Sequence, residues 1–303
     1  MLLIRAFRFL PIAKIRHTPA PKPFWFYPGD VEFGPCTSCV HTCPPPGPVY
    51  KDILWAKILS AMKLLVFQHG DCEHPGSLRG FLERDSFEWD AVELDKGEKI
   101  PDLDEYDVLW VLGGPMDVWD IEDNPWLIDE KLAIRTLVRE MQRPFLGLCL
   151  GHRLLADALG GTCGPQKPAE IGVYDVMLTE AGKNDWIMHG MAEKQRCLQW
   201  HSVRVVQAPD GAEILAGSPH CPIQGMRVGN NAWSMQYHVE VEHDTVDNWA
   251  EIPAYRDALI AEMGEDGVDA MGSAAAAAMS DFLNSAETLY ENFMKVARSQ
   301  HRS

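Results

Sequence analysis

Residues 143–161, RPFLGLCLGHRLLADALGG, contain a short apolar run followed by a helical pattern, with a thiol at the junction. PFLGLC predicts a buried strand, and GHRLLADALGG predicts a helix that ends at glycines. Gly147 and Gly151 flank Cys149 and would permit a tight, strained turn that lifts the thiol off the sheet. The N-terminus of the following helix would favour the thiolate. The stretch predicts either a nucleophile elbow built with sulfur or a buried structural cysteine at a strand end.

The segments around this unit alternate between strand and helix patterns. Strands are predicted at MKLLVFQH, WDAVEL and YDVLWVLGG, and helices at SLRGFLER and NPWLIDEKLAIRTLVREMQ. This alternation predicts an α/β fold in which helices cover both faces of a mostly parallel central sheet. Shorter strand candidates after residue 170 predict a small antiparallel addition and a return to the main sheet. GSAAAAAMSDFLNSAETLYENFMKVA predicts a helix in the C-terminal tail.

Proline content sets the first part of the chain apart. Residues 1–61 hold ten of the 21 prolines and show no sustained period, which predicts a disordered extension. An alternative is that translation begins at Met62, directly before the first strand. We expect a folded domain over 62–249 and a helical extension over 250–303 that packs on this domain.

The charge of the chain is strongly acidic and uneven, with a net value of −17. Residues 1–61 carry seven Lys/Arg against three Asp/Glu, a net of +4, so residues 62–303 carry −21. An acidic body of this kind would repel a phosphate backbone, which argues against nucleic-acid binding and favours a small-molecule substrate. No uncharged apolar stretch reaches the ~18 residues of a membrane-spanning helix, so no membrane contact is expected. The eight cysteines are thinly spread and no secretory signal is recognisable, which indicates a reducing, cytoplasmic setting.

Further groups that suit acyl transfer occur at the ends of other predicted strands. Gly113 and Gly114 follow the strand at 107–112 and could expose backbone N–H groups at the same sheet edge as the thiol. His238 comes just after a strand, and Glu240 follows it by two residues. Because this spacing leaves both side chains on one side of an extended chain, the carboxylate could orient the imidazole.

Together these motifs resemble the class I, or triad-type, glutamine amidotransferases. GGP, GLCLGH, EIG at 170–172, WHSV at 200–203 and MQYHVE at 235–240 occur in the family's order. The likeness covers roughly residues 62–245 and is greatest to stand-alone proteins similar to the amidotransferase domain of GMP synthase. It implies a flavodoxin-like three-layer sandwich and a catalytic triad, with no cofactor or metal.

The resemblance also assigns roles to individual residues. Cys149 would attack the side-chain amide of glutamine, His238 would shuttle the proton and Glu240 would orient His238. The backbone N–H groups of Gly114 and Leu150 would hold the oxyanion. Substrate contacts are expected from the glycine-rich loop, the first turn of the helix and the WHSV segment, which matches a family loop or is alternatively a simple strand. These residues are Gly113, Pro115, Arg153, His201, Ser202 and Val203.

Arg153 is a departure from the family, which usually has Gln at this position. The Arg side chain is longer and always charged, and its guanidinium forks toward carboxylates. It could recognise the α-carboxylate of the substrate, or the site could accept another γ-glutamyl compound. The alternative is that Arg153 points to solvent from the first helical turn.

The expected activity is hydrolysis of a γ-glutamyl amide through a thioester, with release of ammonia and glutamate. The residues after 250 are too few for a synthetase domain, so an ammonia-accepting synthetase would be a separate subunit. One alternative is a γ-glutamyl peptidase that acts on glutathione-like compounds. Another is a regulatory or binding protein without catalysis that retains the pocket.

Two further clusters of cysteine and histidine could be metal sites. Cys36, Cys39, His41 and Cys43 have Cys-x-x-Cys spacing, but the long loop and second pair of a zinc site are missing, so an unstructured segment is favoured. Cys72, with His69 and His74 beside it, is better explained as a loop after the first strand that rims the active site.

Overall fold

The computed structural model describes residues 62–301. The expectations for residues 1–61, including the Cys36 cluster, lie outside the described residues. The strands are β1 (Leu64–Gln68), β2 (Trp89–Glu93), β3 (Val108–Val111), β4 (Phe145–Leu148), β5 (Thr162–Leu178), β6 (Lys194–Gln207), β7 (Ala212–Gly217), β8 (Gly225–Val228) and β9 (Ala232–Met235). The α-helices are α2 (Leu78–Arg84), α3 (Trp126–Arg135), α4 (Leu150–Ala158), α5 (Glu180–Lys183), α6 (Thr245–Ala250), α7 (Pro253–Met263) and α8 (Gly267–His301).

These strands form one nine-stranded mixed sheet in the order β2-β1-β3-β4-β9-β8-β7-β5-β6. The first five strands of this order pair in parallel, and β8, β7, β5 and β6 continue the sheet with antiparallel pairing. The predicted α/β fold with an antiparallel addition is confirmed, and β9 is the predicted return to the main sheet. Parallel strands place their carboxyl ends at one edge, so β1, β3, β4 and β9 deliver the residues that follow them to one place.

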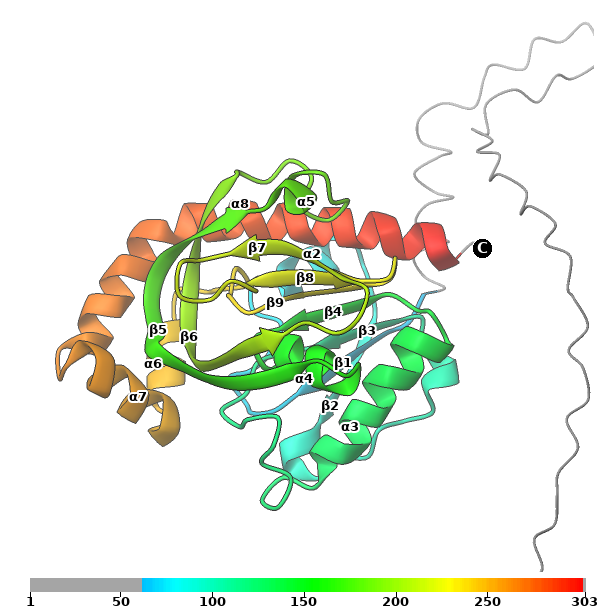
Figure 1. The fold of residues 1–303 in the computed structure, drawn as a ribbon, viewed down its shortest axis with the longest axis horizontal. Helices are drawn as coiled ribbons and strands as arrows, with labels where there is room; N and C mark the ends of the chain where they lie inside the picture. Colours follow the sequence, from blue (N-terminus) through cyan, green and yellow to red (C-terminus); the bar gives the residue numbers. More distant parts are fainter. Residues whose placement is uncertain (1–61, 302–303) are drawn as a thin grey trace, which may run out of the picture. The chain divides into compact units, whose positions relative to one another are not determined.

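Helices cover the sheet on both faces. Leu109, Ile134 and Leu154 belong to a core between the sheet and the helices α3 and α4, whereas Trp110, Leu289 and Phe293 belong to the core under α2 and α8. Strand residues 109 and 110 point to opposite faces because side chains alternate along a strand. Figure 1 shows α8 running along the sheet, with α6 and α7 gathered beside β5 and β6. The result is the flavodoxin-like three-layer arrangement.

The long helix α8 is bound to the sheet by aromatic packing. The ring of Trp110 meets Tyr290 and Phe293 at centroid distances of 6.5 and 6.2 Å, and Trp233 meets Phe293 at 6.3 Å. The helix is longer at both ends than the predicted segment 272–297. Its alanine-rich part therefore belongs to a packed amphipathic helix, because Ala275 and Ala278 are buried on the same stripe.

Strand β5 begins earlier than predicted, at Thr162 and not near residue 172. Two prolines, Pro165 and Pro168, lie in this added part, and proline cannot donate a ladder hydrogen bond. The β5–β6 register shifts between Pro165 and Glu170, so the ladder accommodates the prolines by an irregularity. The extended β5–β6 hairpin places Glu170 and His201 opposite each other.

Candidate active site

The turn between β4 and α4 carries Cys149. This residue has a φ of 50° and a ψ of −97°, a conformation that residues with a side chain rarely adopt. Its N–H donates to the carbonyl of Met235 at 2.8 Å, which ties the turn to the end of β9. The turn is strained as predicted, and the strain lies at the cysteine itself.

The two flanking glycines are required for close packing and do not have positive φ angles. A Cβ on Gly147 would lie 2.6 Å from the carbonyl oxygen of Gly151. A Cβ on Gly151 would lie 2.1 Å from the carbonyl oxygen of Val111. Neither approach is sterically possible, so both glycines allow α4 to begin directly against β3 and β4.

His238 and Glu240 lie beside this turn, just after β9. The Nδ1 atom of His238 is 2.6 Å from Oε1 of Glu240, and the other carboxylate oxygen accepts the N–H of Val239 at 2.9 Å. A bridge between Leu198 and His238 holds the backbone of the histidine. Cys149, His238 and Glu240 are only 3%, 2% and 7% exposed. The three side chains predicted to form a triad therefore lie together in a buried site.

The electrostatics of this trio favour a charged imidazole. Burial lowers the pKa of His238, but Glu240 and the sulfur of Cys149, with which His238 shares a side-chain hydrogen bond, raise the pKa well above its ordinary value. Burial raises the pKa of Glu240, but its ion pair and hydrogen bond with His238 lower it overall. The Nε2 group of Gln236 also donates to Sγ of Cys149 at 3.6 Å. The arrangement allows thiol and imidazole to exchange a proton while Glu240 holds the ring.

The N–H groups of Gly114 and Leu150 make no hydrogen bond to any group in residues 62–301. The two residues are neighbours, because a Cβ on Gly114 would lie 2.8 Å from Cδ2 of Leu150. Leu150 begins α4 directly after the thiol. Two unpaired donors next to a nucleophile suit a developing oxyanion. Gly113 is buried beside them, whereas Pro115 is exposed on the same loop.

Arg153 is buried in α4, so the interpretation that it points to solvent is wrong. Its Nη1 group donates to Oδ1 of Asp117 at 2.6 Å, and the side chain is 6% exposed. Its charge interacts with the sulfur of Cys149. Its Nε group has no hydrogen-bond partner among the described residues. A buried cation with a free donor beside the thiol is suited to an anionic group of a substrate.

The segment Trp200 to Val203 is part of strand β6 and not a loop as the family pattern implied. Its ladder with β5 supplies the hydrogen bonds that a loop would lack, which explains the extended conformation. The ring of His201 lies 3.2 Å from Oε2 of Glu170 and 3.1 Å from the carbonyl of Val203. Burial lowers the pKa of His201 in spite of Glu170. Ser202 is exposed.

Two aromatic residues cover the site, and the sequence did not single them out. We call Trp249 and Tyr255 the roof. The ring of Trp249 packs on His238 with centroids 4.6 Å apart, and its Nε1 group donates to the carbonyl of Cys72 at 3.2 Å. The hydroxyl of Tyr255 donates to Glu73. The roof thus connects α6 and α7 to the loop after β1, which rims the site as expected.

Glu73 is a buried acid beside the predicted oxyanion loop. It is 3% exposed, and its Oε2 atom would be 2.3 Å from a Cβ on Gly113, so only glycine fits there. Burial raises the pKa of Glu73, while the charge of His238 and the hydroxyl of Tyr255 oppose the rise. The available signal was its position a few residues after a strand that neighbours β3, since both strands end at the same edge.

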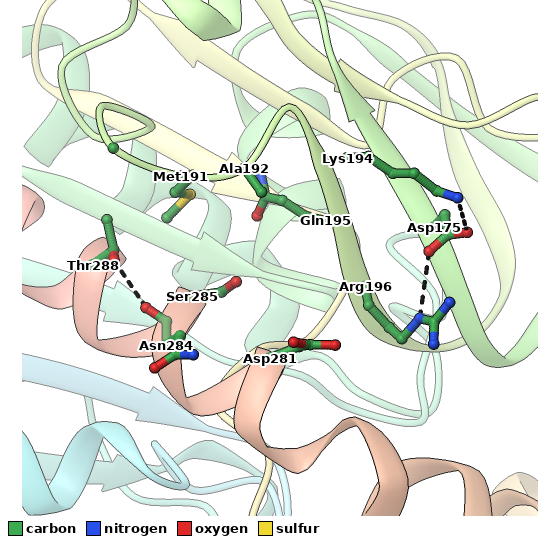
Figure 2. A pocket seen from close by; sticks show the side chains of 11 residues that line it. Asp175, Met191, Ala192, Lys194, Gln195, Arg196, Asp281, Asn284, Ser285 and Thr288 are labelled. Carbon is green, nitrogen blue, oxygen red and sulfur yellow. Dashed lines mark hydrogen bonds and ion pairs between the residues drawn. The ribbon is translucent and has the colours of Figure 1, made fainter.

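A surface pocket of about 360 Å³ lies elsewhere, between the β5–β6 hairpin and α8 (Figure 2). Its basic residues Lys194 and Arg196 both pair with Asp175, at 2.8 and 3.5 Å. None of the predicted site residues lines this pocket.

The described residues contain no arrangement of three or more His, Cys, Asp or Glu side chains that could hold a metal ion. His69 uses both ring nitrogens, toward Gly113 and Glu130, so it is not free to bind a metal with Cys72 and His74. Across 62–301, no helix is long and apolar enough to span a bilayer.

The chain belongs to the class I glutamine amidotransferases, because the family model "Glutamine amidotransferase class-I" matches residues 78–249, more than half of the chain. Among similar proteins, the amidotransferase-type subunit of glutamine-hydrolyzing GMP synthase from Sulfolobus acidocaldarius is 30% identical over 155 residues, covering 51% of this chain and 78% of that protein. The glutamine amidotransferase-like protein YfeJ of Salmonella typhimurium is 28% identical over 196 residues, covering 61% and 79%. The match to GMP synthase of Aeropyrum pernix is 31% identical over 45% of this chain, and it spans about a quarter of that protein, 26%.

Solved structures agree with this assignment. A glutamine amidotransferase from Thermotoga maritima has a TM-score of 0.68 at 27% identity, covering 77% of this chain and 98% of that one. A glutamine amidotransferase from Methylobacillus flagellatus has a TM-score of 0.67 at 25% identity, covering 77% and 94%. The likeness extends over most of the part of the chain that the structure describes.

Proposed function

We propose that this protein hydrolyses γ-glutamyl amides, glutamine first among them, with Cys149 as nucleophile. The observation that carries the proposal is the buried His238–Glu240 pair, 2.6 Å apart, next to a thiol on a strained turn. A structural cysteine would need neither a charged imidazole beside it nor free N–H donors in front of it. Family membership supports the same chemistry.

The reaction proceeds in two steps. In the first, the sulfur of Cys149 attacks the side-chain carbonyl carbon, and the developing oxyanion is held by the N–H groups of Gly114 and Leu150. The C–N bond breaks as His238 gives its proton to the leaving nitrogen, which departs as ammonia. In the second step, water gives a proton to His238 and attacks the thioester carbon. The C–S bond breaks, and glutamate and the free thiol are regenerated.

Arg153 is proposed to bind an anionic group of the substrate. Its free Nε group and its charge lie close to the sulfur of Cys149, and Asp117 holds the other end of the guanidinium. The α-carboxylate of a γ-glutamyl group is one partner. A γ-glutamyl peptide carries an additional carboxylate, so this replacement of the family Gln favours a γ-glutamyl peptidase as the second candidate.

Use of the released ammonia by a separate synthetase chain is a further part of the proposal. The Sulfolobus acidocaldarius relative supports it, since that protein is named as one subunit of a GMP synthase and therefore implies another. Stimulation of glutamine hydrolysis by a partner chain would be the expected sign.

A substrate panel tests the proposal. Wild-type protein is incubated with glutamine, glutathione and a γ-glutamyl anilide, and ammonia, glutamate and amine are measured. Cys149→Ser is expected to lose at least about 10³-fold in turnover. The matched control is Cys221→Ser, which alters another buried thiol. Full turnover by Cys149→Ser, or binding of all three compounds without hydrolysis by the wild type, would contradict the proposal.

A further inference from the structure

A second histidine–carboxylate pair lies at the opposite side of the predicted oxyanion loop. His69 follows β1, and its side chain and that of Glu130 in α3 are both fully buried. The Nε2 atom of His69 is 2.9 Å from Oε1 of Glu130. Its Nδ1 atom is 2.7 Å from the carbonyl oxygen of Gly113. Both ring nitrogens are therefore engaged.

The partner of Nδ1 fixes where one proton must be. A carbonyl oxygen can only accept a hydrogen bond, so Nδ1 of His69 carries a hydrogen and donates it to Gly113. This holds whether the proton between Nε2 and Glu130 lies on the ring or on the carboxylate. Trp126 stacks on the ring with centroids 5.4 Å apart and planes 15° from parallel. The ring has little freedom to turn away.

The peptide that receives this hydrogen bond joins Gly113 to Gly114. In a trans peptide, the carbonyl and the following N–H point in opposite directions, so fixing the Gly113 carbonyl also fixes the Gly114 N–H. A Gly–Gly peptide has no Cβ on either side and can flip between orientations easily. A flip would present an oxygen where the oxyanion needs a donor.

We infer that His69 is a positioning residue that holds the Gly113–Gly114 peptide with its N–H directed to the reacting carbonyl oxygen. The inference rests on the proposed function, because the Gly114 N–H has a role only if an oxyanion forms at Cys149. Glu130 acts one step further out by keeping the ring in place. The other titratable group that faces His69 is Glu73, from the loop after β1.

The buried pair is costly to maintain, which argues for such a role. Burial lowers the pKa of His69, but the ion pair and hydrogen bond with Glu130 outweigh burial and raise this pKa above its ordinary value. The second oxygen of Glu130 has no partner among the described residues. A buried ion pair with an unsatisfied oxygen is weak evidence for stability, and apolar residues would fill the space with less desolvation.

Two double variants separate the Nδ1 donor from the rest of the pair. His69→Asn with Glu130→Gln keeps an amide N–H near the Nδ1 position, whereas His69→Leu with Glu130→Gln has the same branched shape without a donor. Neither leaves a stranded carboxylate, so both carry a similar structural penalty. Glutamine hydrolysis and the alkylation rate of Cys149 by iodoacetamide are measured for both, with thermal melting to establish folding.

The Leu variant is expected to have a kcat about 10²- to 10³-fold below that of the Asn variant, with KM little changed. Alkylation displaces iodide from a saturated carbon and forms no oxyanion, so its rate stays equal in both variants. The single variant Glu130→Gln leaves the Nδ1 proton in place and keeps most of the turnover; it serves as a second measurement if the Leu variant does not fold.

Equal kcat values for the two double variants would overturn the inference. So would a parallel loss of alkylation in the Leu variant, which would indicate collapse around the thiol, or a loss as large in Glu130→Gln. If wild-type protein hydrolyses no γ-glutamyl amide through Cys149, the proposed function fails and takes this inference with it. An active wild type with indistinguishable variants rejects the role of His69 alone.

Discussion

The two buried histidine–carboxylate pairs differ in what the second ring nitrogen faces. The ring of His238, held by Glu240, faces the thiol of Cys149, whereas that of His69, held by Glu130, faces a backbone carbonyl. A thiol can lose and regain a proton, and a carbonyl cannot. The same two residue types therefore supply a movable proton in one place and a fixed donor in the other.

Removing the movable proton should have the largest effect. His238→Gln is expected to lower kcat by about 10³- to 10⁴-fold, because neither acid nor base remains beside the thiol. The loss should exceed that of the His69→Leu double variant. Steady-state kinetics of both proteins under identical conditions decide the order, and the reverse order would break the comparison.

The carboxylates should differ in how they affect the pH profile. Glu240 helps to raise the pKa of His238, so Glu240→Gln lowers this pKa, and the imidazolium that protonates the leaving group is lost at lower pH. The alkaline limb of the kcat/KM profile should move to lower pH, with turnover reduced by about 10²-fold. Glu130→Gln should leave the limb in place. A shift of equal size in Glu130→Gln would show that the two pairs are not distinct in role.

The roof lies over His238, and loosening it should have a moderate effect. Tyr255→Phe removes the hydrogen bond to Glu73 but leaves the contact of Trp249 with Cys72. One net hydrogen bond corresponds to about 2- to 10-fold in an opening equilibrium, so alkylation of Cys149 by iodoacetamide should accelerate by about that factor. The rate is measured by intact mass. A rate equal to that of the wild type would mean that the roof does not limit access.

The smallest effect concerns stability and pH at the fixed pair. The pKa of His69 is raised in the folded state, so its stabilising contribution is fully present below the unfolded value near 6.5 and is lost as pH rises through the folded value. The difference in Tm between wild type and the His69→Asn, Glu130→Gln variant should therefore shrink from pH 6 to higher pH. Each kcal/mol corresponds to roughly 2–4 °C for a domain of this size. A difference that grows with pH would contradict the sign.

The strand, turn and helix around Cys149 could be predicted because the information is local. Gly147, Cys149 and Gly151 lie within five residues, and His238 and Glu240 are separated by two. The glycines, however, matter for backbone contact with Val111 and with each other, and no pattern in the sequence indicates those contacts. Strand order places β3 against β4, and only that order explains why Gly151 must lack a side chain.

The fixed pair and the roof were not predictable for the same physical reason. His69 and Glu130 are 61 residues apart, and Trp249 and Tyr255 come from helices that follow the last strand. Their contacts arise because parallel strands bring the ends of β1 and β3 to one edge and because α6 and α7 fold back over that edge. Arg153 illustrates the limit within a helix, since its burial depends on Asp117 in another loop.

The backbone at Cys149 has a consequence for engineering. A left-handed torsion at a residue with a side chain costs on the order of 1–3 kcal/mol, which glycine would largely avoid. Heat resistance and reactivity are thus opposed at one rotatable bond. Anyone seeking a hardier version of this chain must look for improvements elsewhere and leave that angle as it is.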